Sequence, residues 1–290
     1  MADLHIHTNL SDSTRSVEEV VDTAISKDLT DIAITDHNDA RSADAVREIA
    51  KKRDIPLNVY TGSEFGTSFE KRQIEIVGIG FDDKIVAKYL KDYHQRQKLI
   101  NTQQILYNRL LEIVRKERLN YDPNSNYNNG IQRLYNELAK YKENTDAFPV
   151  LQNYATFIRQ GLYNPESMFF LGYHEFTPDL DEILQLIEYT GGKSFIPHPH
   201  EFGFNDTFGY LTKLQSKHSV DGLEAFNPQH DNDETKALID FASKNNKLIS
   251  GGSDDHGDGK KHQKIGMINI DKQYLEWLNP DVLTTSNRKR

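Results

Sequence analysis

Residues 2–39 read ADLHIHTNLSDSTRSVEEVVDTAISKDLTDIAITDHND, and this stretch predicts the fold of the chain. It opens with an alternating strand over residues 2–7. The pair Ser16 and Glu19 forms a capping box at the start of a helix whose apolar residues recur at helical spacing. A second apolar strand follows over residues 31–35. The order strand, helix, strand is the unit from which parallel sheets and barrels are built.

The same rhythm continues beyond this stretch. A helix is expected over 42–52, and Thr177-Pro178 predicts the start of another. Further strands are predicted at residues 56–61, 73–79, 193–196, 220–226 and 247–250. Between 83 and 174 the pattern is helical without a convincing strand. We therefore expect an α/β domain formed by residues 1–82 and 175–290, interrupted by a helical insertion over 83–174.

Composition narrows the functional classes. The chain has 290 residues and a net charge of −9, which disfavours duplex DNA as a partner. It contains no Cys, which excludes disulfide frameworks, thiolate zinc sites and Cys nucleophiles. No stretch is apolar for long enough to span a membrane, and residues 3–7 do not resemble a secretory leader. We expect a cytoplasmic protein, and the sequence leaves its oligomeric state open.

Candidate metal ligands follow the predicted strands. Carboxyl ends of strands meet at one rim in βα folds, so residues distant in sequence converge there. Imidazoles and carboxylates suit Zn, Mn or Fe. The segments that carry them are Asp3-Leu4-His5-Ile6-His7, Thr35-Asp36-His37-Asn38, Gly62-Ser63-Glu64, Pro197-His198-Pro199-His200 and Gly252-Ser253-Asp254-Asp255-His256.

Each motif has a simpler explanation when taken alone. His5 and His7 share one strand face, about 6–7 Å apart along the chain, and two strand His can also make ordinary hydrogen bonds. His37 could belong to a helix-capping turn, and Glu64 could be solvated. The conjunction of several ligand-bearing segments in one βα pattern nevertheless indicates a metal centre.

As an ordered set, these segments resemble the PHP superfamily, the polymerase and histidinol phosphatase phosphoesterases. The resemblance covers residues 1–82 and about 178–257, and it also includes Asp12 in Ser11-Asp12. It implies a distorted (β/α)7 TIM-like barrel carrying a helical insertion. Order and spacing are most similar to the small stand-alone bacterial members, which act on nucleotide-type phosphoesters.

The resemblance implies up to three divalent ions per chain: Mn, Fe or Zn, with Mg also allowed. The implied ligand sets are His5, His7, Glu64 and Asp254 for the first ion, Glu64, Glu75 and His198 for the second, and Asp12, His37 and His256 for the third. Glu75 departs from the family, which usually has His at that position, so it could instead point to solvent. We expect Asp254, His256, Glu64 and His37 to be catalytic.

The expected activity is hydrolysis of phosphate esters of nucleotides or short oligonucleotides, such as nucleoside 3′,5′-bisphosphates, by an activated water. Small phosphorylated substrates, including RNA or DNA ends, are the expected partners. Three alternatives stay open: a histidinol-phosphate phosphatase, an amidohydrolase that cleaves C–N bonds, and a nucleotide-binding protein without turnover.

Substrate-binding candidates rest on their proximity to the motifs in the sequence. They are Arg15, Lys193, His200 and His230. Asp36 could orient an imidazole ligand or serve only as a turn carboxylate. Ten of the 14 Tyr lie in the insertion, where they could pack between helices or stack on a base. The Asn-rich loop over 120–130 could narrow the cleft.

Overall fold

The computed structural model describes residues 1–123, 130–259 and 262–278, and the chain divides into two compact units. The first unit consists of residues 1–67, residues 75–92 and the described residues from 179 onward. The second unit consists of residues 68–74 and 93–178. Most of the predicted Asn-rich loop, residues 124–129, lies outside the described residues.

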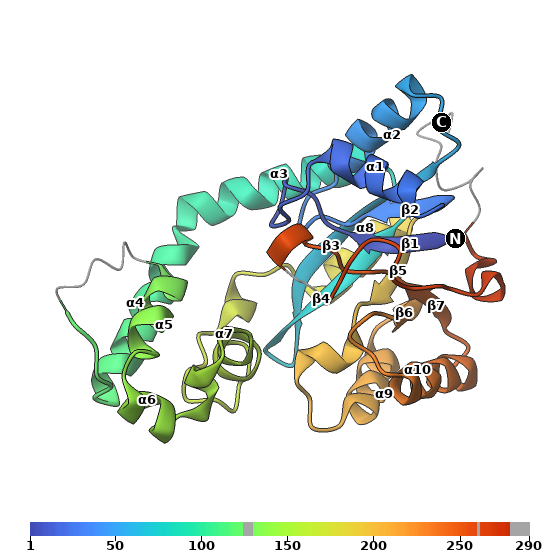
Figure 1. The fold of residues 1–290 in the computed structure, drawn as a ribbon. Coiled ribbons are helices and arrows are strands. Elements are labelled where there is room, and N and C mark those ends of the chain that lie inside the picture. Colours follow the sequence, from blue (N-terminus) through green and yellow to red (C-terminus); the bar gives the residue numbers. More distant parts are fainter. Residues whose placement is uncertain (124–129, 260–261, 279–290) are drawn as a thin grey trace. The chain divides into compact units, whose positions relative to one another are not determined.

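The first unit is organised around a seven-stranded sheet whose strands follow one another in chain order (Figure 1). Two runs of three strands are parallel, β1 with β2 and β3, and β5 with β6 and β7. The predicted α/β fold is therefore confirmed. The strands are β1 (Ala2–Ile6), β2 (Asp31–Ile34), β3 (Asn58–Phe69), β4 (Arg72–Ile79), β5 (Lys193–Ile196), β6 (Gly222–Phe226) and β7 (Leu248–Gly251).

The hairpin of β3 and β4 departs from the prediction. Glu70 and Lys71 form a two-residue turn in which both residues have positive φ, 50° and 69°, the geometry of a tight turn between antiparallel strands. β4 is also antiparallel to β5. The strand predicted over 56–61 extends to Phe69, because the polar residues that seemed to end it are buried in the hairpin. Glu64 consequently lies within β3 and not after its end.

The two edges of the sheet meet just beyond the end of β7. The backbone N–H of Asp254 donates to the His5 carbonyl at 2.8 Å, and the His7 N–H donates to the Asp255 carbonyl at 3.2 Å. Gly252 permits this approach, since a Cβ there would lie 2.3 Å from the His5 nitrogen. The sheet is not closed along its full length, but this seam holds its first and last strands together.

Helices occupy the connections between strands of the first unit (Figure 1). Ser16 caps the first of them through the predicted capping box. The helix predicted to start at Thr177 starts at Leu180, because the Asp179 carboxylate accepts the N–H of Asp181 as its cap. The helices are α1 (Val17–Ser26), α2 (Ser42–Lys52), α8 (Leu180–Tyr189), α9 (Thr207–Lys217) and α10 (Asn232–Lys244), and α3 (Asp83–Ile100) runs from the first unit into the second.

Apolar side chains fill both faces of the sheet. Leu4, Tyr60, Ile79 and Phe195 are buried in one cluster. A second cluster packs Ile6 and Ile34 against the apolar faces of α1 and α2. The pairing of β1 with β2 shifts in register between Asp3 and Ile6, and Leu4 accordingly packs in the first cluster and Ile6 in the second, while His5 and His7 contribute to a polar group.

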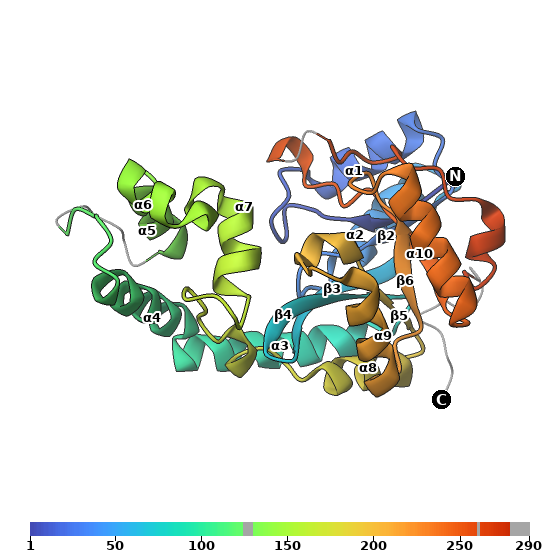
Figure 2. The same ribbon diagram turned by 90° about the horizontal axis from the view of Figure 1, so that it is seen from below.

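The second unit is helical and has a core of its own, built on Leu110, Leu134 and Phe157. Tyr107 and Tyr135 are buried in this core, which supports the packing interpretation for these two residues. Its helices are α4 (Thr102–Lys116), α5 (Ile131–Leu138), α6 (Lys142–Ala147) and α7 (Tyr154–Thr156), of which α4 and α5 lie side by side (Figure 2). Among the described residues, none of the helices combines the length and hydrophobicity that crossing a bilayer would require.

Candidate metal centre

All of the predicted metal ligands lie in the first unit, near the carboxyl ends of its parallel strands. Glu75 joins them because β4 runs in the opposite direction, so its beginning lies at this end of the sheet. Asp12 reaches the cluster from the loop between β1 and α1. Three groups of side chains place their ligand atoms within 4.8 Å of one another: His5, His7, Glu64 and Asp254; His37, Glu64 and Glu75; and His7, Asp12, His37 and His256.

The first group is the most tightly arranged. The Nε2 atoms of His5 and His7 are 3.1 Å apart, and each lies 3.3 Å from Oε2 of Glu64. Oδ1 of Asp254 lies 3.5 Å from the His5 nitrogen and 3.2 Å from the His7 nitrogen. Ligands held at about 2.1 Å from one ion are separated by about 3.0–3.4 Å in octahedral or tetrahedral geometry. These spacings match a coordination shell around a single ion.

Glu64 links the first group to a second one. Its Oε1 lies 3.0 Å from Nε2 of His198, while its Oε2 faces the first group. Glu75 points toward these side chains, with Oε2 3.9 Å from His198 and Oε1 3.8 Å from Nδ1 of His37. The two oxygens of one buried carboxylate therefore face two different sets of ligands.

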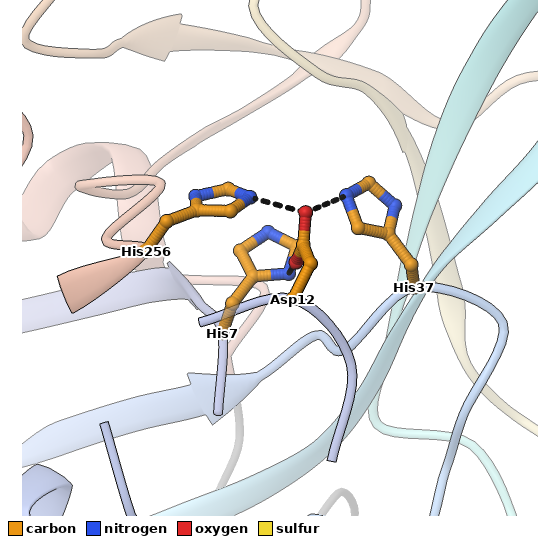
Figure 3. Close-up of side chains that lie close together, drawn as sticks. All are labelled: His7, Asp12, His37 and His256. Carbon is orange, nitrogen blue, oxygen red and sulfur yellow. Dashed lines mark ion pairs between the residues drawn. The ribbon is translucent and has the colours of Figure 1, made fainter. Parts of the chain in front are cut away.

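The third group is centred on Asp12 (Figure 3). One of its carboxylate oxygens lies 3.3 Å from Nε2 of His256 and 3.6 Å from Nε2 of His37. The other lies 3.7 Å from Nδ1 of His7. His7 therefore faces the first group with one ring nitrogen and Asp12 with the other. The Asp12 side chain is 53% exposed, so this group forms the open side of a cluster that is otherwise mostly buried.

Two of the predicted ligand residues have unusual backbone conformations. His198 has φ of 26° and Asp254 has φ of 51°, both in the left-handed region that non-glycine residues rarely adopt. Such conformations persist where the surrounding structure imposes them, and they concentrate at functional sites. His198 lies two residues after the end of β5, and Asp254 lies three residues after the end of β7.

The supporting contacts differ from the prediction for Asp36. Its carboxylate does not orient an imidazole: it accepts hydrogen bonds from Thr8, Ser11 and Ser42. These bonds hold the loop that carries Asp12, because Thr8 and Ser11 belong to that loop.

Sequence reasoning missed Glu224, which contacts His5 in the role predicted for Asp36. The Glu224 carboxylate lies 3.0 Å from Nδ1 of His5 and is buried within β6. A charged residue flanked by the apolar Leu223 and Ala225 was the signal that could have identified it.

Two further acidic residues missed by the sequence reasoning hold the loop after β7. Asp3 accepts the backbone N–H groups of Ser253 and Gly266. Asp255 accepts the N–H of Ile265 and both of its oxygens contact Nε of Arg15. Together these carboxylates anchor the segment that presents Asp254 and His256.

The clustered charges perturb one another strongly. Burial alone would lower the pKa of His7, but Asp254 and Glu64 raise it to about 9. The pKa of His5 is likewise raised by Glu64, Glu224 and Asp254 in spite of its burial. Burial opposes ionisation of Glu64, yet the neighbouring His37 and His5 hold its pKa well below the usual range. Positive charge is thus needed between these carboxylates, and protons on the imidazoles supply it where cations do not.

The substrate-binding candidates divide into two pairs. Arg15 is paired with Asp255, and Lys193 begins β5 and pairs with Asp221 at 2.9 Å. Lys193 is five residues before His198, about 15 Å along an extended chain, so the structure does not bring it to the cluster. His200 and His230 lie together, with ring centroids 5.4 Å apart. The Nε2 atom of each is buried without a hydrogen-bond partner among the described residues.

The donor set fits hard or borderline divalent cations. It offers only imidazole nitrogens and carboxylate oxygens, and the Nδ1 atoms of His7 and His198 are buried without hydrogen-bond partners among the described residues. Ligands of this type suit Zn, Mn or Fe in sites that keep open positions. Residues from both ends of the sequence thus form one site that could hold several such ions.

Comparisons with known proteins agree with this chemistry. A family model described as the PHP domain matches residues 3–189. The 5′-3′ exoribonuclease Rnm of Escherichia coli is 25% identical over 273 residues, covering 88% of this chain and 84% of that protein. The phosphoribosyl 1,2-cyclic phosphate 1,2-diphosphodiesterase of Eggerthella lenta is 22% identical over 269 residues, covering 88% and 94%.

Solved structures share the fold. A protein from Bifidobacterium adolescentis assigned as a metal-dependent phosphoesterase superposes with a TM-score of 0.63 at 19% identity, covering 94% of this chain and 93% of that one. An amidohydrolase from Chromobacterium violaceum superposes with a TM-score of 0.66 at 22% identity, covering 93% and 91%. At these identities the likeness supports the distorted barrel architecture.

Proposed function

Since the chain belongs to the PHP domain family, we propose that this metal-dependent phosphoesterase hydrolyses phosphate esters of nucleotides or short oligonucleotides. The observation that carries the proposal is the convergence of His5, His7, Glu64 and Asp254 at spacings that suit a single ion. Two relatives of low identity support the substrate class, because one is an exoribonuclease and the other acts on a phosphoribosyl cyclic phosphate.

The proposed ligand sets are those that the resemblance implies, and they are supported by the clustering of the side chains, although the structure groups His37, and not His198, with Glu64 and Glu75. His5, His7, Glu64 and Asp254 would hold one ion, Glu64, Glu75 and His198 a second, and Asp12, His37 and His256 a third. When bound, divalent ions of the Mn, Fe or Zn type supply positive charge that makes a water nucleophilic near neutral pH and offsets charge on phosphoryl oxygens. The carboxylate of Glu64 would bridge the first two sets.

The side chains of the cluster differ in their access to a substrate. Asp12 and His37 are 53% and 30% exposed, while His5, His7, Glu64 and Asp254 are almost fully buried. A phosphate group would therefore reach the cluster from the side of Asp12 and His37. The buried residues would hold the ligand geometry fixed and keep bulk water out, which strengthens every electrostatic interaction at the reacting group.

His200 and His230 are proposed to contact the part of the substrate that does not react. Nδ1 of His230 donates to the Ala225 carbonyl at 3.0 Å, so in the neutral ring Nε2 is an acceptor. Burial lowers the pKa of His230, which favours this neutral form. Its partner would then be a donor such as a ribose hydroxyl, whereas His200 could contact a second phosphate.

Arg15 and Lys193 complete the predicted substrate-binding set, and the structure favours them less. Both cations already have carboxylate partners, Asp255 and Asp221 respectively. Substitution of Lys193 is therefore expected to leave the KM for a nucleotide unchanged.

Product release from three substrates tests the proposal, measured as inorganic phosphate from the two small phosphoesters and as inorganic phosphate or mononucleotides from the RNA. Purified protein loaded with Mn²⁺ would be compared on a nucleoside 3′,5′-bisphosphate, a short 5′-phosphorylated RNA and histidinol phosphate. The proposal expects kcat/KM to be highest for the bisphosphate or the RNA. A preference for histidinol phosphate would refute the assignment of nucleotides as substrates. No product from any of the phosphoesters would refute the proposal that the protein is a phosphoesterase acting on such substrates. His218→Ala serves as a control, because His218 pairs with Asp181 outside the cluster.

A further inference from the structure

Glu224 is the buried carboxylate that contacts the cluster without belonging to any of the three ligand groups. Its side chain is 2% exposed. Its Oε2 lies 3.0 Å from Nδ1 of His5 and also accepts the backbone N–H of His198 at 3.1 Å. Its Oε1 accepts Nδ2 of Asn227 at 3.0 Å. A single side chain thus contacts His5 of the first group and His198, which faces Glu64 and Glu75.

The hydrogen bonds around Glu224 determine which atoms carry protons. The backbone N–H of His198 can only donate. Oδ1 of Asn227 accepts the N–H of Gln229 at 2.9 Å, so the Asn227 amide must turn its NH2 toward Glu224. Both carboxylate oxygens therefore act as acceptors. His5 must then contribute an N–H at Nδ1, because two acceptors cannot form a hydrogen bond.

This assignment has a consequence at the opposite side of the His5 ring. A neutral imidazole with its proton on Nδ1 keeps the lone pair on Nε2. That atom faces His7, Glu64 and Asp254, at 3.1–3.5 Å. A carboxylate behind a ligand imidazole also raises its basicity and fixes its orientation.

His198 depends on the same oxygen in a different way. Its φ of 26° is unfavourable for a residue with a side chain, so its conformation must be maintained by neighbouring contacts. The bond from its N–H to Glu224 is buried, and without that partner the donor would have no access to water.

We propose that Glu224 is a positioning residue of the metal centre, which holds Nε2 of His5 ready for an ion and fixes the backbone of His198 through the same carboxylate oxygen. The inference rests on the proposed metal-dependent function. It predicts that loss of Glu224 weakens ion binding at the first and second ligand sets together. The third set, around Asp12, does not contact Glu224 and should keep its ion.

Glu224→Ala and Glu224→Gln test the proposal. Ions per chain would be measured by elemental analysis after equilibrium dialysis, and Mn²⁺ affinities by calorimetry. Glu224→Ala is expected to weaken binding at two of the sites by 10–100-fold. Glu224→Gln should weaken it less, since an amide keeps one acceptor but turns an NH2 toward Asn227 or His198. If the alanine variant does not fold, the ion affinities of the glutamine variant test the role of Glu224.

Glu137→Gln is the matched control, because Glu137 is also a buried glutamate but belongs to α5 in the second unit. It should retain the ion content of the wild type. A second readout separates positioning from general stability: ¹⁵N spectra of Zn²⁺-loaded protein labelled at histidine report which ring nitrogen of His5 carries the proton. The wild type should show it on Nδ1, and Glu224→Ala should lose that fixed state.

The outcomes distinguish the two proposals. A wild-type protein that binds no divalent ion would overturn the proposed function itself. A wild type that binds ions, with folded Glu224 variants whose affinities stay within twofold of it, would overturn only the role of Glu224. A proton found on Nε2 of His5 in the wild type would also overturn the role of Glu224, and not the proposed function.

Discussion

The seam between β7 and β1 gives the sharpest test of how the fold positions the site. In Gly252→Ala the new methyl group would lie 2.1 Å from Cβ, 2.3 Å from N and 2.6 Å from Cα of His5. These are backbone-linked atoms that no rotamer change can move away. The strand ends must therefore separate, and the backbone bonds from Asp254 to His5 and from His7 to Asp255 would lengthen or break.

The cost can be worked from these contacts. Two backbone hydrogen bonds contribute about 1 kcal/mol each, and overpacking of a tight site costs about 1–3 kcal/mol. Replacing a glycine also reduces the conformational entropy of the unfolded chain, which adds about 0.4–1 kcal/mol to the free energy of unfolding. The expected loss in the free energy of unfolding is thus about 2–5 kcal/mol. Separation of the seam also moves Asp254 away from His5, so ion affinity should fall by at least tenfold.

Urea denaturation and Mn²⁺ calorimetry measure the two effects. Gly161→Ala is the matched control, since the nearest atoms to the added carbon there belong to the side chain of Phe157, at 3.2 Å. It should lose much less stability and no ion affinity. A Gly252→Ala protein with wild-type stability and wild-type ion binding would refute the view that close contact between these strands builds the site.

Other perturbations of the cluster have separable outcomes. Asp254→Ala or His7→Ala should abolish phosphate release while circular dichroism shows a retained fold; near-normal turnover in either would contradict the ligand assignment. Glu64→Gln should reduce the bound ions by more than one per chain in elemental analysis, because its two oxygens face different ligand sets; loss of a single ion would contradict bridging. The pKa of His7, raised to about 9, adds stability that is present below pH 6.5 and lost as pH rises toward 9. In chelator-treated protein, the urea midpoint should therefore fall over this interval, which corresponds to a loss of up to about 3 kcal/mol in the free energy of unfolding. Added Zn²⁺ should abolish the fall. An unchanged midpoint would contradict the raised pKa.

The sequence was sufficient to predict the ends of most strands and the ligands beside them. An apolar run followed by Asp-His, Pro-His or Ser-Asp marks both the end of a strand and a polar group at the rim, so His37, His198 and Asp254 could be located by local pattern. The capping box at Ser16 was equally local, because all of its partners lie within three residues.

The features that local pattern could not reveal depend on pairing between distant segments. The sequence predicts that Glu64 follows the end of a strand, and only the pairing of β3 with β4 shows that Glu64 lies within β3. Asp36 and Glu224 are both acidic residues near strands, and their different roles follow from which side chains fold against them. Lys193 is near a metal motif in sequence but at the opposite end of β5, since a strand carries its residues away from the rim.

The bonds that join the loop after β7 to β1 have a consequence for how the enzyme is made. Ser253 donates to Asp3 across 250 positions of the chain. While the ribosome is still synthesising the middle of the protein, the N-terminal histidines are already outside it, without the aspartate that completes their coordination. Such long-range contacts form late and slowly. Loading of the first and third ligand sets must therefore wait until synthesis has passed Asp254 and His256, and a nascent chain stalled before those residues should bind no ion at either set.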